Sequence, residues 1–132
     1  MSDSGLVLVD TSVWIQFFRH APSAEAKILD EVLAAGSVAT CAPIRAEVIS
    51  GAPTKHEFQR LRKLFGALTV LEPPTEVWNH IAEHRFHLAR NGMQVSLVDL
   101  WIAVTADFHH VSLWTLDKDF TSIKTAIPVR LY

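Results

Sequence analysis

Four acidic residues stand in or beside apolar stretches of the sequence: Asp10, Glu47, Asp99 and Asp117. Asp10 directly follows the apolar run 6–9, and Asp99 is the one charged residue in its surrounding ten-residue stretch, "VSLVDLWIAV". A carboxylate in apolar surroundings is costly unless a partner compensates its charge. These four positions are therefore the first candidates for a functional site.

Basic residues near these acids are too few to neutralise them. Arg45 is the one basic residue close to Glu47 in the sequence, and Lys118 is the one close to Asp117. Several carboxylate oxygens that face one hole are the ligands that a hard divalent cation such as Mg²⁺ requires. The cation would also remove the repulsion that otherwise raises carboxylate pKa values. The pattern predicts a Mg²⁺ site.

Helix capping is an alternative explanation for each acid taken alone. Asp10, Thr11 or Ser12 could cap the first helix, and Ser96 with Asp99 matches a capping box. Asp117 and Asp119 flank a predicted helix start, where acids are favourable. The two roles do not exclude each other, and the joint pattern of acids at strand ends and in short apolar helices favours a metal site.

The elements that must position these acids alternate between short apolar strands and helices. We expect strands at 6–9, 38–42, 68–71, 111–115 and 129–131, and helices at 12–19, 24–35, 44–50, 54–65, 74–91, 96–109 and 119–125. This alternation predicts one α/β domain over residues 1–132, with a central parallel sheet of about five strands and helices on both faces. Ligands bind such sheets at the carboxyl ends of the strands, where Asp10 and Asp117 stand.

Composition restricts the class of protein. The chain has 132 residues, 49% of them hydrophobic, and a net charge of −2, which excludes a disordered chain. The single cysteine, Cys41, cannot form an internal disulfide, and the N-terminus carries no basic stretch typical of a signal peptide. The longest uncharged run, 32–44, is too short and polar to span a membrane. We therefore expect a cytoplasmic protein.

Four motifs in order resemble the signatures of PIN-domain nucleases, and more narrowly of the VapC-type toxins of bacterial type II toxin–antitoxin pairs. They are "LVLVDTSVWI", "AEVISG", "VSLVDLWIAVTA" and "LWTLDKDF", and they extend over essentially the whole chain. The resemblance implies an endoribonuclease that hydrolyses RNA phosphodiester bonds with Mg²⁺ or Mn²⁺. It also implies a cognate antitoxin as partner.

The resemblance assigns roles to individual positions of this chain. It implies that the catalytic and metal-binding acids are Asp10, Glu47, Asp99 and Asp117, with Asp119 as an alternative fourth acid and Thr11 and Thr115 as supporting hydroxyls. The mechanism it implies is attack by a metal-activated water, with no Ser, Cys or His nucleophile.

The first predicted helix suggests a surface for partners. Trp14, Phe17 and Phe18 make this helix apolar nearly all round, so we expect it to contact something outside the monomer. We predict that these aromatic residues form a groove for the antitoxin, and that an antitoxin arginine could occupy the acidic pocket. The apolar helix and the positive mean hydropathy also predict a homodimer.

Two other functions compete with a nuclease. One is a catalytically inactive PIN-like module that only binds partners, although the presence of all four acids argues against it. The other is a receiver-like signalling domain, which requires a pair of acids after the first strand and an acceptor Asp after the third. Here Asp10 stands alone, and the third strand ends in Glu72-Pro73. A phosphatase of the haloacid dehalogenase type would require an Asp where Ser12 stands.

Overall fold

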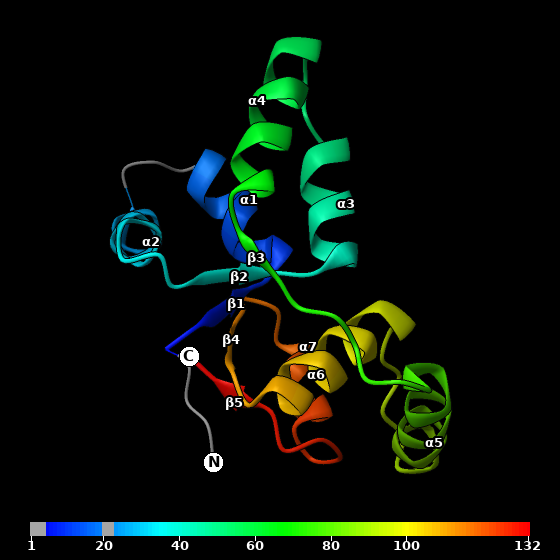
Figure 1. Cartoon of the computed structure of the whole chain (residues 1–132). Helices are drawn as coiled ribbons and strands as arrows, with labels where there is room; N and C mark the ends of the chain where they lie inside the picture. The colour runs from blue at the N-terminus through cyan, green and yellow to red at the C-terminus, as the bar shows by residue number, and fades with distance from the viewer. Residues whose placement is uncertain (1–4, 20–22) are drawn as a thin grey trace.

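The computed structural model describes residues 5–19 and 23–132 (Figure 1). In chain order the elements are β1 (Val7–Val9), α1 (Thr11–Arg19), α2 (Ala24–Ala34), β2 (Val38–Thr40), α3 (Ala42–Ser50), α4 (Lys55–Gly66), β3 (Thr69–Val70), α5 (Val77–Arg90), α6 (Leu97–His109), β4 (Ser112–Trp114), α7 (Asp119–Ile123) and β5 (Arg130–Leu131). None of the helices described is long and apolar enough to cross a membrane.

The strands form one parallel sheet in the order β3-β2-β1-β4-β5. Helices α1 to α4 connect strands on one side of β1, and α5 to α7 connect the others, so right-handed crossovers place the two groups on opposite faces. Figure 1 shows α3 and α4 above the sheet and α5 to α7 below it. The predicted α/β class, with a five-stranded parallel sheet and helices on both faces, is confirmed.

The central strand β1 marks the point where the chain reverses its direction across the sheet. From β1 the chain moves outward through β2 to β3 and then returns to β4 on the other side of β1. Asp10 follows β1 directly, and Asp117 lies three residues after the end of β4. Both acids therefore lie at the topological switch point, where open α/β sheets bind ligands. A receiver-like sheet has the order 2-1-3-4-5, so this alternative is excluded.

Most predicted bounds agree with the structure to within a few residues, and the differences have local causes. The long helix begins at Val77 instead of residue 74, because Glu76 adopts a left-handed backbone conformation with φ 65°. The edge strands β3 and β5 each have only two residues, and all four of these residues are exposed. Short edge strands limit unwanted pairing with other chains.

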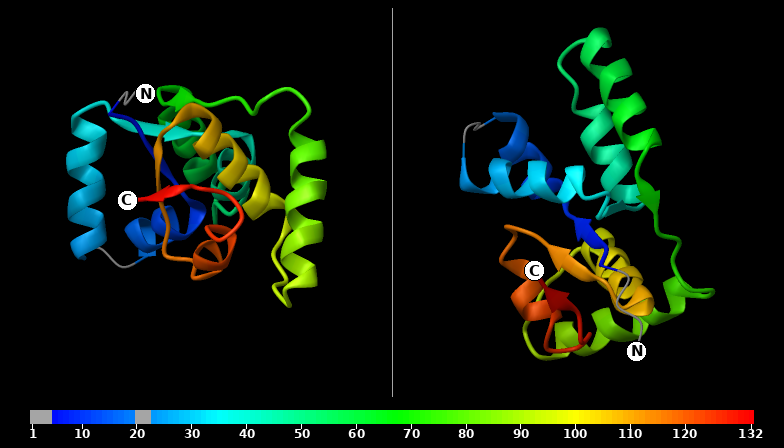
Figure 2. Two further views of the ribbon diagram at one scale, coloured as in Figure 1. Left: turned by 90° about the horizontal axis from the view of Figure 1, so that it is seen from below. Right: turned by 60° about the vertical axis from the view of Figure 1, so that its left-hand side comes forward.

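Helices α3 and α4 form an antiparallel pair that projects from the sheet as an arm (Figure 2). A turn joins them, and the side chain of Thr54 caps α4 by accepting a hydrogen bond from the backbone N–H of Glu57 at 3.1 Å, which is typical of a capping box. At the base of the arm, α1 packs against α2 and α3. The arm therefore stands beside the helix that begins at Thr11, next to the switch point.

Candidate metal centre

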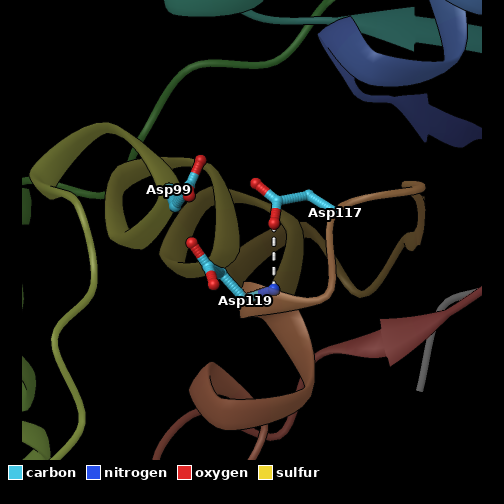
Figure 3. Close-up of side chains that lie close together, drawn as sticks. All are labelled: Asp99, Asp117 and Asp119. Atoms are coloured by element: carbon cyan, nitrogen blue, oxygen red, sulfur yellow. Dashed lines mark hydrogen bonds between the residues drawn. The ribbon is translucent and has the colours of Figure 1, made fainter.

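Three aspartates point toward one another beside the switch point (Figure 3). Asp99 lies in the first turn of α6, Asp117 in the loop after β4, and Asp119 at the start of α7. One carboxylate oxygen from each lies within 4.8 Å of the others, which is the one grouping of this kind in the described part of the chain. The structure thus brings together three of the acids that the sequence singled out. We call them the acid cluster.

Local hydrogen bonds fix the backbone at each member of the acid cluster. Ser96 Oγ accepts a hydrogen bond from the backbone N–H of Asp99 at 3.0 Å, so the predicted N-cap of α6 is present. Asp117 Oδ1 accepts one from the backbone N–H of Asp119 at 2.9 Å. These hydrogen bonds are compatible with a shared cation, because a carboxylate has two oxygens and the backbone N–H of Asp119 takes up only one oxygen of Asp117.

The charge of the acid cluster has no counter-charge in the described protein. Within residues 5–19 and 23–132, the one ion pair is Arg60–Glu57 at 2.8 Å, between two residues of α4. The pKa of Asp99 is raised to about 6. Burial is the main cause, and the negative charges of Asp117, Asp10 and Asp119 contribute to the same shift. The cluster is therefore an electrostatically strained set of oxygen ligands, which a divalent cation would relieve.

Asp10 lies next to the acid cluster and is held by two hydroxyl groups. Its side chain is buried, and its Oδ2 accepts hydrogen bonds from Ser12 Oγ and from Thr115 Oγ1, each at 2.8 Å. The same hydroxyls accept the backbone N–H groups of the loop after β4: Leu116 donates to Ser12 and Asp117 to Thr115, each at 3.0 Å. Among the described residues Asp10 Oδ1 has no hydrogen-bond partner, so it remains available to a ligand.

Ser12 is a hydrogen-bond partner of Asp10 that the sequence interpretation missed. The sequence suggests it only as a helix cap, whereas its hydroxyl joins the turn after β1 to the loop after β4. The signal was its position two residues after Asp10, from which a short side chain can reach back to the carboxylate. Thr115, which the sequence predicts as a supporting hydroxyl, donates a hydrogen bond to Asp10 and accepts one from the backbone N–H of Asp117.

Glu47 lies apart from the acid cluster. It is exposed on α3, and its Oε1 accepts a hydrogen bond from Thr11 Oγ1 at 2.9 Å. Cys41, the N-terminal cap position of α3, lies near both Asp10 and Glu47. Burial raises the pKa of Cys41 to about 12, and the charges of the two acids add to this effect. Cys41 is thus a protonated, unreactive thiol, and Glu47 faces the site from its rim.

The structure corrects the predicted aromatic groove. Trp14 is fully buried: its indole packs on Phe65 of α4 at a centroid distance of 4.8 Å and on Phe18 at 6.0 Å. It belongs to the core and not to a surface, because α1 lies between α2 and the arm. Phe17 and Phe18 do line a surface hollow together with α2 and Arg60. A second hollow, also lined by Phe18, reaches Glu47.

The donor set of the acid cluster fits a hard divalent cation. All three side chains offer carboxylate oxygens, and neither imidazole nor thiolate takes part, which favours Mg²⁺ or Mn²⁺ over Zn²⁺. Their spacing lets one ion lie between them. Asp99, Asp117 and Asp119 would hold the ion, and Asp10 Oδ1 could contribute a further ligand.

Comparisons with known proteins agree with this geometry. The model of the PIN domain family matches residues 7–125. Ribonuclease VapC5 of Mycobacterium tuberculosis is 34% identical over 129 residues, covering 94% of this chain and 92% of the relative. Ribonuclease VapC11 of the same species is 30% identical over 122 residues, covering 89% and 91%.

Solved structures show the same fold. The VapBC-1 complex of nontypeable Haemophilus influenzae matches with a TM-score of 0.76 at 22% identity, covering 96% of both chains. The VapBC-5 toxin–antitoxin system of M. tuberculosis matches with a TM-score of 0.65 at 28% identity, covering 96% of this chain and 97% of that one. The chain therefore belongs to the PIN domain family, and within it to the VapC ribonucleases, as its four motifs predict.

Proposed function

We propose that this chain is a Mg²⁺-dependent endoribonuclease and the toxin of a type II toxin–antitoxin pair. The observation that carries the proposal is the acid cluster: three carboxylates without a counter-cation, at the switch point of a VapC-type fold. A catalytically inactive partner-binding module would have no reason to keep this electrostatically costly arrangement.

Each acid has a distinct task in the proposed hydrolysis. Asp99, Asp117 and Asp119 would hold the cation, and the hydrogen bonds from Ser12 and Thr115 to Oδ2 would leave Oδ1 of Asp10 available to it. When bound, Mg²⁺ or Mn²⁺ neutralises charge on the scissile phosphate and lowers the pKa of water. Glu47 keeps Oε2 free, because Thr11 hydrogen-bonds to Oε1, and this second oxygen orients the attacking water.

The chemistry is a single displacement at phosphorus. The water oxygen forms a new bond to phosphorus and gives up one proton to solvent, one ester P–O bond breaks, and the leaving oxygen takes up a proton from solvent. No side chain of the protein forms a covalent intermediate in this scheme. The chain's own contribution is to gather the carboxylates and to fix their directions through hydroxyl and backbone hydrogen bonds.

Cleavage of single-stranded RNA by the purified protein tests the proposal. We expect cleavage with Mg²⁺ or Mn²⁺, none with EDTA, and none with the Asp99→Asn variant. Asp107→Asn, an acid on the same helix outside the cluster, is the matched control and should cleave normally. RNA cleavage that persists in EDTA would contradict the metal-dependent mechanism, and a folded protein that never cleaves RNA would favour the inactive module.

We further propose that an antitoxin binds along the hollows lined by Phe17 and Phe18. The second hollow extends from Phe18 to Glu47, so one bound segment could reach from the aromatic side chains to the acids. An arginine of that segment would then compete with the cation for the carboxylates. Phe18→Ala should weaken antitoxin binding with little loss of stability, and inhibition should weaken as Mg²⁺ is raised. Inhibition independent of Mg²⁺ would exclude the arginine mechanism.

We also propose that residues 1–132 form one nuclease domain, which acts in the cytoplasm as a homodimer. The apolar side chains of Trp78 and Phe86 on α5 are exposed, which supports a dimer interface that would bury them. Trp14 gives no such support, because it is already buried in the monomer. Light scattering that reports the monomer mass of 14.7 kDa at micromolar concentration would contradict the dimer.

A further inference from the structure

Positive charge is concentrated on the projecting arm. The segment 42–66, which contains α3 and α4, holds five of the chain's 12 Lys and Arg residues and two of its 14 acids. Its net charge is therefore +3 in a chain whose net charge is −2. One of the two acids, Glu57, is neutralised by Arg60. The arm is the basic part of an otherwise acidic molecule, and apart from Arg60 none of its Lys and Arg residues has an ion-pair partner among the described residues.

Two arginines of the arm meet at one surface hollow. Arg45 of α3 and Arg62 of α4 line it together with Phe58, Val70 and Glu72. The guanidinium carbon of Arg62 lies 5.9 Å from the centroid of the Phe58 ring. Neither guanidinium has a hydrogen bond or ion pair to any described residue, although Glu72 lines the same hollow. Both guanidinium groups are therefore free to bind an anionic ligand. Repulsion from Glu72 would keep the negative charge of that ligand on the side of the two arginines.

The hollow lies at the same edge of the sheet as the acid cluster. Ala42, which follows β2, and Glu72, which follows β3, both line it, and the order β3-β2-β1 leads from there to Asp10. Neighbouring strands are about 4.8 Å apart, so the ends of β2 and β3 beside the hollow lie about 5 to 10 Å along this edge from the end of β1, which Asp10 follows. It shares no lining residue with the hollows of Phe17 and Phe18.

We propose that the hollow of Arg45, Phe58 and Arg62 binds single-stranded RNA on its way to the acid cluster. This inference rests on the proposed ribonuclease function and deepens it. Arg45 contacts a backbone phosphate, and the plane of the Arg62 guanidinium, supported by the Phe58 ring, stacks on an unpaired base. The exposed side chain of Val70 extends the apolar edge of this platform. A duplex has no splayed base to stack there, so the site selects single strands.

Equilibrium binding of RNA tests the hollow separately from cleavage. Fluorescence anisotropy of a labelled mixed-sequence single-stranded oligoribonucleotide is measured against salt concentration, with the Asp99→Asn protein in EDTA as parent. Adding Arg45→Ala and Arg62→Ala should weaken binding about tenfold and reduce the salt slope by roughly 0.7 for each phosphate that the protein no longer neutralises. Arg62→Lys should keep the slope of the parent but not its full affinity, since lysine cannot stack.

The matched control is the pair Arg90→Ala and Lys124→Ala in the same parent. Arg90 lies over the Phe86 ring at 5.3 Å on α5, so it reproduces the Arg62–Phe58 contact on another surface. This control should bind RNA like the parent. An equal loss in both double variants, or no loss in either, would overturn the hollow as a binding site. Tight binding of duplex RNA at the hollow would overturn its selectivity for single strands.

Cleavage by the otherwise unaltered enzyme distinguishes failure of this inference from failure of the proposed function. Arg45→Ala with Arg62→Ala should raise KM with little change in kcat, because the acid cluster is intact. Normal KM in this variant overturns the inference and leaves the ribonuclease standing. If the wild-type chain neither binds nor cleaves RNA, both proposals fail. Melting curves of the variants confirm that they are folded.

Discussion

The acid cluster and the pair Asp10 and Glu47 differ in what surrounds their carboxylates. Hydroxyl groups donate to the pair: Ser12 and Thr115 to Asp10, and Thr11 to Glu47. In the acid cluster it is a backbone N–H that donates to a carboxylate, from Asp119 to Asp117. Hydroxyl groups thus hold one oxygen of each acid of the pair, whereas the hydrogen bond to Asp117 in the acid cluster comes from the backbone.

This difference divides the site into a part that binds and a part that positions. An unsatisfied group of carboxylates supplies most of the affinity for a cation. The hydroxyl-held pair supplies direction, because hydrogen bonds to one carboxylate oxygen fix where the other points. We therefore expect substitutions in the two parts to change activity by different amounts and for different reasons.

The largest effect should come from the acid cluster. Asp99→Asn removes a charge from the cation site while it preserves the size of the side chain. Residues that only support a metal ligand typically cost about 10- to 100-fold in activity when they are replaced. We expect RNA cleavage by Asp99→Asn to fall by more than this. Initial rates at saturating Mg²⁺ measure this. A loss no larger than that of Asp107→Asn would break the distinction between the cluster and an ordinary surface acid.

A smaller loss should follow removal of a hydroxyl. Thr115→Ala leaves Asp10 with one hydroxyl partner and the backbone of Asp117 without its acceptor, so we expect cleavage to fall roughly 10- to 100-fold. Thr115→Ser retains the hydroxyl and should recover most of the activity. Thr125→Ala, which removes an exposed hydroxyl bonded only to the Ser122 carbonyl, serves as the control. Equal loss in the alanine and serine variants would mean that packing matters and the hydrogen bond does not.

The smallest effect concerns stability and its dependence on pH without metal. The folded-state pKa of Asp99 is about 6, above its ordinary value of 3.8. Protonation of Asp99 therefore contributes to the free energy of unfolding. This contribution is fully present below about pH 3.8 and is lost as the pH rises through about 6. Asp99→Asn should melt a few degrees above the wild type at pH 7, with a weaker pH dependence.

With Mg²⁺ present, the wild type should melt at a higher temperature than Asp99→Asn, the reverse of the order expected without metal. The ion binds only the folded acid cluster, so it should raise the melting temperature of the wild type and leave Asp99→Asn nearly unchanged. Asp107→Asn should respond to Mg²⁺ as the wild type does. Identical melting curves for wild type and Asp99→Asn, with and without Mg²⁺, would show that the acids do not act together.

The fold could be predicted from the sequence because its signals are local. Short apolar runs separated by amphipathic segments predict a parallel α/β sheet, and Gly92 and Thr54 mark the ends of helices. The two-residue strands and the late start of α5 could not be predicted, since they depend on edge exposure and on the left-handed backbone at Glu76.

Of the candidate site, the sequence indicates which acids to consider but not which of them lie together; the structure groups Asp99, Asp117 and Asp119. The residue pattern locates the acids at strand ends and helix starts, but the side-chain directions that separate Asp119 from Glu47 arise from tertiary packing. The role of Ser12 was hidden for the same reason, because its second partner is the backbone of Leu116, far along the chain. The expectation that Trp14 lies at the surface was wrong because a one-helix pattern does not reveal that α4 covers it.

Binding of Mn²⁺ followed by electron paramagnetic resonance tests the acid cluster most directly, because it needs neither substrate nor partner. Free Mn²⁺ is titrated with wild type, Asp99→Asn, Glu47→Gln and Asp107→Asn, and Mg²⁺ is then added as competitor. We predict binding by the wild type that Mg²⁺ displaces, at least about tenfold weaker binding by Asp99→Asn, and a smaller loss in Glu47→Gln. Equal Mn²⁺ affinity in wild type and Asp99→Asn, or no binding by the wild type, would contradict a cation site at the acid cluster.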